Sequence, residues 1–222
     1  MADTIRVMIE SGKKQKKWVA VSFDWPGWER NGKSEVDALQ VLGHYRPRYR
    51  KVAELAGLEE EFDAAGDFMI VERVEGSSTA DFFGISQISA ASEHEQMAEE
   101  ACERKLALLR ACWTFFDETY PRVSAELRKG PRGGGRDRDQ IVRHTYGSES
   151  EFARKIGIRD EPERTPEGLR VYREDYQNAI RALNAEGKPA RTWTLQFLIR
   201  RTCFHMLDHA WEMEDKDLSS VD

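Results

Sequence analysis

Hydrophobic and polar residues follow two different periods along this chain. Residues 4–10 alternate polar and apolar, and residues 18–23 are rich in types that suit a pleated surface, so both segments are expected to be strands. The turn dipeptide Asn31-Gly32 predicts a short return strand at 28–30, and residues 68–74 regain strand character. From residue 92 onward, apolar residues recur at helical spacings.

A helix is expected to follow the first three strands. Ser34 can cap its free N–H groups, and Glu35 and Asp37 favour the positive end of the helix dipole. Pro47 predicts a break or a new helical turn, after which residues 51–58 continue as helix. The first region therefore reads as a small sheet with one or two helices.

Turn and cap residues divide the second region into helices. Ser92 and Glu95 form a capping-box pattern that predicts a first long helix ending near residue 127. The glycine-rich stretch 129–136 is read as a flexible linker rather than an anion-binding loop, because no strand precedes it. Three further helices are expected at residues 137–156, at 165–185 with Thr165 as cap and Pro166 in the first turn, and at 192–214.

These patterns predict an α+β fold. Residues 1–88 would form the small sheet module, and residues 89–222 would form an antiparallel four-helix bundle, since four helices with modest connections pack most naturally in that way. A length of 222 residues, of which 40% are hydrophobic, is enough for one large domain or two small ones.

Composition narrows the partners that are expected. No apolar run approaches the roughly 20 residues of a membrane span, and the first residues lack the order of a signal peptide, so a cytoplasmic protein is expected. The net charge of -6 argues against broad attraction to nucleic acid. The three cysteines have no CxxC spacing and imply no disulfide framework or thiolate zinc site, and Cys102 and Cys112 are expected to be core residues.

The last predicted helix carries the clearest chemical pattern, which is the pair His205 and His209. Residues four apart lie one above the other on a helix, so both imidazoles can reach one ion. A catalytic metal usually has three protein ligands, and His144 on a partly apolar turn of the second helix is the best third candidate. His44 and His94 are weaker ones.

Two other interpretations of these residues stay open. The paired histidines can simply hydrogen-bond in a core. Glu212 can ligate, can orient His209, or can be a solvent-facing charge, and the last interpretation is favoured. Tyr146, Tyr172, Asp175 and Tyr176 are further acid–base candidates that the sequence does not rank.

These histidines, in this helix order, resemble the DinB-like family, which includes metal-dependent thiol transferases that use bacillithiol or mycothiol. The resemblance covers roughly residues 92–217. It implies a four-helix bundle with one divalent metal, zinc, nickel or iron, held by His144 from the second helix and by His205 and His209 from the fourth. A low-molecular-weight thiol is the cofactor that the thiol-transferase members suggest, although no stretch of this chain matches a thiol pocket.

Residues 21–39 resemble a different family, the HicB antitoxin fold. The shared features are a strand, Pro26-Gly27, a glycine turn and an acidic helix start. An antitoxin would normally carry a DNA-binding segment, and no ribbon-helix-helix or helix-turn-helix pattern is present, so a small interaction or ligand-sensing module is favoured. Trp25 and Trp28 can make contacts with a partner, but core packing is the favoured role.

Two functional hypotheses follow. The first is a metal-dependent thiol transferase or hydrolase that acts on a small-molecule substrate, with the metal at His144, His205 and His209. The second is a non-catalytic binding or sensing protein that dimerises through its bundle and acts through its N-terminal module.

Overall fold

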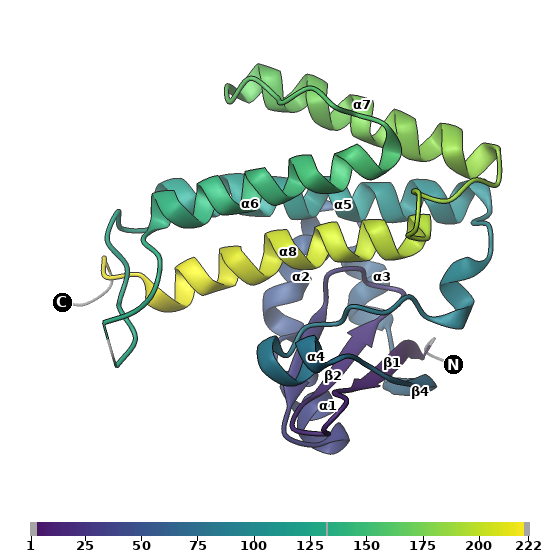
Figure 1. Ribbon diagram of the computed structural model, residues 1–222, viewed down its shortest axis with the longest axis horizontal. Helices are drawn as coiled ribbons and strands as arrows, with labels where there is room; N and C mark the ends of the chain where they lie inside the picture. Colours follow the sequence, from purple (N-terminus) through teal and green to yellow (C-terminus); the bar gives the residue numbers. More distant parts are fainter. Residues whose placement is uncertain (1–3, 132, 220–222) are drawn as a thin grey trace.

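The computed structural model describes residues 4–131 and 133–219 (Figure 1). Its sheet has four strands in the order β3-β2-β1-β4. Strand β2 pairs antiparallel with both β1 and β3, whereas β4 pairs parallel with β1. The strands are β1 (Ile5–Ser11), β2 (Trp18–Ser22), β3 (Glu29–Gly32) and β4 (Phe68–Glu75). Each lies within two residues of a strand that the sequence predicts.

The N-terminal module holds more helices than the one or two expected. They are α1 (Glu35–His44), α2 (Arg46–Leu55), α3 (Glu59–Ala64) and α4 (Ser78–Phe83). The Ser34 hydroxyl caps α1 by accepting from the Asp37 N–H, as predicted. The helical stretch expected at 51–58 ends earlier, because Gly57 adopts a positive φ of 69° and separates α2 from α3. The Ser77 hydroxyl caps α4, which the sequence analysis missed.

Successive side chains of β1 and β2 point to opposite faces of the sheet, and both faces of these two strands are buried. Ile5, Val7 and Ile9 point into the main core, together with Ala38 and Leu42 of α1. Residues on the opposite face form a smaller core with α4, whose buried members are Met8, Val19, Val21, Phe23, Ala80 and Ala90. Strands β1 and β2 are therefore covered on both sides, which explains their fully apolar stretches, whereas alternate residues of β4 are exposed.

Four long helices follow the module: α5 (Glu99–Thr119), α6 (Arg138–Ala153), α7 (Pro166–Ala185) and α8 (Leu195–Lys216). In Figure 1 they extend along one another above the sheet. Thr165 caps α7, with Pro166 in its first turn, as predicted. Helix α8 begins three residues later than predicted, because Thr194 rather than Thr192 caps it by accepting from the Phe197 N–H.

The predicted span of the first long helix is wrong at both ends. Ser92 lies in a short 3₁₀ turn (Ala91–His94), and Glu95 is extended, so the helix begins only at Glu99. At the other end Pro121 has no N–H to continue the helical hydrogen bonds, and a 3₁₀ turn (Tyr120–Arg122) follows α5. The four strands together with these helices make the chain an α+β protein.

Helix α8 lies between the module and α6, and one main core runs from Ile5 to Met213. The turn before β3 lies directly on α8: Gly27 has a φ of 92°, and an added Cβ would come within 2.8 Å of the Cys203 Cβ. Arg48 of α2 pairs with Glu214 at 2.7 Å. Within the described ranges, no helix is long and apolar enough to cross a membrane.

Candidate metal centre

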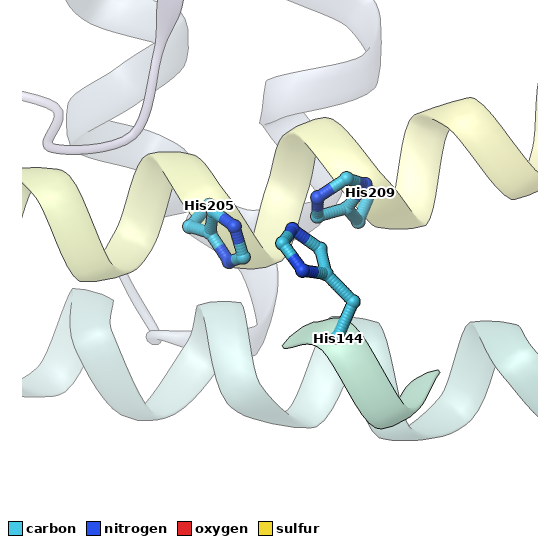
Figure 2. A group of neighbouring side chains, drawn as sticks. All are labelled: His144, His205 and His209. Atoms are coloured by element: carbon cyan, nitrogen blue, oxygen red, sulfur yellow. The ribbon is translucent and has the colours of Figure 1, made fainter. Parts of the chain in front are cut away.

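Helices α6 and α8 bring the three sequence-predicted histidines together. His205 and His209 lie one turn apart on the face of α8 that meets α6, and His144 projects from α6 towards them (Figure 2). His209 is buried, at 9% exposure, and His144 is the most exposed of the three. The sequence spacing fixes the pair on α8, and the packing of α6 against α8 supplies the third ring.

The ring geometry suits a single ion. The ring centroid of His144 lies 5.0 Å from the ring centroid of His205 and 5.0 Å from that of His209. The ring centroids of His205 and His209 lie 4.7 Å apart. One nitrogen from each ring lies within 4.8 Å of the others. Zn–N bonds of about 2.0–2.1 Å would place nitrogens on one tetrahedral ion roughly 3.4 Å apart. Small side-chain rotations are therefore enough to close the three rings on an ion.

The pKa values of His144 and His205 suit metal ligands. Burial lowers the pKa of His205 well below its usual value, and His209 and Arg201 lower it further. Burial and then His209 also lower the pKa of His144. Burial thus favours the neutral form, which metals bind, in His144 and His205. Among the described residues, the buried Nδ1 of His205 has no hydrogen-bond partner.

Glu212 lies one turn beyond His209 and contacts it, so the favoured interpretation as a solvent-facing charge is wrong. Its Oε2 lies 2.8 Å from the His209 Nδ1, and its Oε1 accepts from Lys216 at 2.6 Å. These bonds, led by the one from His209, lower the pKa of Glu212 to about 2. An ionised carboxylate only accepts, so the Nδ1–H of His209 donates to it, and Nε2 is the ring nitrogen left to bind a metal.

Two of the other acid–base candidates are engaged elsewhere. Tyr146 donates to Asp117 at 3.0 Å, and Tyr176 shares a hydrogen bond with Thr202 at 3.0 Å. Tyr172 is buried, and Asp175 is exposed on α7. The aromatic side chain next to the centre is instead Phe152, whose ring centroid lies 5.9 Å from that of His205.

The remaining sequence candidates lie outside the cluster. His44 ends α1 and His94 ends the 3₁₀ turn before α5, and the only metal-capable group found in the described chain consists of the three histidines above. The three cysteines are buried, which confirms the core role expected for Cys102 and Cys112. Trp25 and Trp28 are at most 2% exposed, and the Trp28 Nε1 donates to the Leu42 carbonyl, which confirms their core role.

A second polar group was missed by the sequence analysis. We call it the charged core cluster; it consists of Glu10, Glu29, Glu93 and Arg200. Arg200 lies nine positions before His209, which is two and a half helical turns, so it faces the opposite side of α8. All four side chains are at most 4% exposed. An arginine inside the apolar start of α8 was the available signal, because a buried arginine needs an acidic partner.

Hydrogen bonds in the charged core cluster centre on Arg200. Its guanidinium donates to both carboxylate oxygens of Glu93, at 2.8 and 2.9 Å, and to the Ser86 hydroxyl at 3.1 Å. Glu29 lies farther away, at 3.6 Å, and accepts from the Ser86 N–H. Burial raises the pKa of Glu29 to about 7, against the opposing effect of Arg200.

The chain was compared with known proteins at three levels. No protein-family model, no curated protein and no solved structure matches it.

Proposed function

We propose that this protein is a DinB-like metalloprotein in which α5 to α8 form the family's four-helix bundle and His144, His205 and His209 hold one divalent ion. The observation that carries the proposal is the convergence of three imidazoles from α6 and α8 within 4.8 Å. The unpartnered Nδ1 of His205 and the contact between Glu212 and His209 support it. Imidazole ligands favour zinc, nickel or iron over magnesium or calcium.

The donor set is that of a catalytic rather than a purely structural site. Three protein ligands leave a position open, and a bound divalent ion would lower the pKa of a water or thiol there, for hydrolysis or for thiol transfer to an electrophile. The chain's own residues prepare this position. Glu212 fixes the tautomer of His209, and the partial exposure of His144 leaves the centre accessible to a small-molecule substrate.

The metal content of the untagged protein tests the first step. We expect mass spectrometry of the metal to find about one zinc, nickel or iron ion per chain. If the metal has been removed by a chelator, titration of the protein with the metal should restore about one ion per chain. The His205→Ala/His209→Ala variant should lose the ion and keep its helical circular dichroism. The His44→Ala/His94→Ala variant is the matched control and should keep both. A native protein that binds no ion after loading contradicts the proposal.

The reaction is tested separately, with metal-loaded protein. We expect transfer of a low-molecular-weight thiol to an aryl halide, or hydrolysis of an activated ester, to require the ion and to be lost in His144→Ala. Turnover that survives chelation would contradict a metal-dependent enzyme. Stoichiometric metal without turnover on any such substrate would leave the centre in place and remove the enzymatic assignment.

A further inference from the structure

A cavity of about 600 Å³ lies where the N-terminal module meets α5. Its walls come from the start of β1, the turn after β2, α3, β4 and α5. None of the three histidines lines it. Its volume is within the range of small-molecule sites, and such sites often occur where two parts of a protein meet.

The floor of this cavity is apolar. Ile5, Phe23 and Trp25 line it, and each is at most 6% exposed. Met69 and Ala101 line it as well and are exposed, which places them towards solvent. A ligand that fills the cavity therefore needs an apolar body, because a fully polar molecule would lose its hydration against these side chains.

The charged groups of the cavity are unbalanced. Its lining holds three cations, Arg6, Arg104 and Lys105, and two carboxylates, Asp24 and Glu61. Arg6 donates to Asp24 at 2.6 and 2.9 Å, and Arg104 donates to Glu61 at 2.6 and 3.1 Å. Each carboxylate is therefore engaged by one arginine, and the excess positive charge belongs to Lys105.

Lys105 is the cation of this lining that has no carboxylate partner among the described residues. Its Nζ donates to the Phe23 carbonyl at 3.0 Å and, within residues 4–131 and 133–219, forms no ion pair. An ammonium has three donors, so two remain for a ligand. Burial lowers the pKa of Lys105 to about 8, against the effects of Glu93 and Asp24, and at neutral pH the group is still mainly charged. Removing an unpaired ammonium from water costs free energy, and a bound anion would offset that cost.

We propose that this cavity binds a small organic carboxylate, with the carboxylate on Lys105 and an apolar body against Ile5, Phe23 and Trp25. A monoanion matches the single free ammonium. A phosphate dianion would need further free donors, and both arginines are already held by carboxylates. The site does not depend on the histidine centre, because none of its lining residues belongs to that centre.

Calorimetric titration of the full chain with 1-naphthoate, benzoate and octanoate tests this proposal, with 1-naphthamide as the uncharged probe. We expect saturable binding of at least one carboxylate and much weaker binding of the amide. Lys105→Met keeps most of the unbranched side chain without its charge and should weaken carboxylate binding at least roughly tenfold. Ala101→Trp should block the cavity while keeping Lys105.

The matched control is Lys17→Met. Lys17 also donates to a backbone carbonyl, that of Phe82 at 3.0 Å, but does not line the cavity, so its loss should leave binding unchanged. The proposal is overturned if none of the three carboxylates binds, or if binding survives in Lys105→Met or in Ala101→Trp. If Lys105→Met fails to fold, Ala101→Trp decides the result alone.

Discussion

Helix α8 carries a cluster of polar side chains on each of two opposite sides, and the two clusters differ in charge and in how their polar atoms are satisfied. The histidine centre towards α6 consists of three imidazoles. Burial lowers the pKa of two of them, His144 and His205. The charged core cluster towards the module consists of three carboxylates around one guanidinium.

This difference separates a site that can accept an ion from one that supplies its own counterion. Arg200 already occupies the place that a cation would take beside Glu93 and Glu29. His205 has an unpartnered Nδ1 within the described chain, and the partly exposed His144 leaves a route for an ion. We therefore expect the charged core cluster to determine stability and the histidine centre to determine metal binding.

Replacement of Arg200 gives the largest expected effect. Arg200→Met removes the counter-charge of Glu93 and Glu29 and leaves both buried, which should lower the free energy of unfolding by about 3–5 kcal/mol. Urea unfolding of chelated protein measures this change. The control is Arg170→Met, whose exposed pairs with Glu167 and Glu174 should leave the urea midpoint almost unchanged. An equal loss in both variants would remove the distinction between buried and exposed pairs.

Glu29 should contribute a pH-dependent part of the stability. Its pKa is raised in the folded state to about 7, from an ordinary value of 4.5, so its contribution to stability is complete below about pH 4.5 and is lost as the pH rises through about 7. The loss amounts to about 3 kcal/mol. In Glu29→Gln this loss is absent, so the variant should gain stability relative to the native protein between about pH 5 and about pH 8.

Urea unfolding of Glu29→Gln and of the native protein, each at about pH 5 and about pH 8, measures the difference in their free energies of unfolding. Glu10, Arg200, Arg201 and Ser86 all act on Glu29 and remain in the variant, so the change reports the loss of one titrating group. Glu60→Gln replaces an exposed carboxyl and should show the same difference at both pH values. If Glu29→Gln behaves like Glu60→Gln, the carboxyl of Glu29 is ionised throughout this range.

The two clusters also differ in how far the sequence could predict them. His205 and His209 lie on one helix, so their spacing is sufficient to place both on one face. His144 could be ranked above His44 and His94 only by its partly apolar turn and by helix order. Glu10, Glu93 and Arg200 come from a strand, a 3₁₀ turn and α8, and no local pattern links residues so far apart in the chain.

Similar limits explain the errors in the fold. All four strands were predicted, because alternation, strand-forming residues and turn dipeptides are local signals. The predicted first long helix is too long at both ends, because the pattern of Ser92 and Glu95 places its start too early and the end near residue 127 takes no account of the break at Pro121. In the structure Glu93 lies in the 3₁₀ turn and binds Arg200, which is 107 residues away. A tertiary contact thus uses the segment that the capping pattern assigned to a helix start.

Replacement of Glu212 gives the smallest expected effect and tests the histidine centre most finely. Glu212→Ala removes the acceptor that fixes the Nδ1–H tautomer of His209, which should weaken metal binding by roughly tenfold or more without changing the stoichiometry. Competition with a chromophoric chelator measures the affinity. Lys216→Met removes the other partner of Glu212 and leaves its contact with His209, so it should bind metal like the native protein. Equal affinity in Glu212→Ala and the native protein would show that the carboxylate does not act through His209, and a loss of stoichiometry would instead make Glu212 a ligand itself.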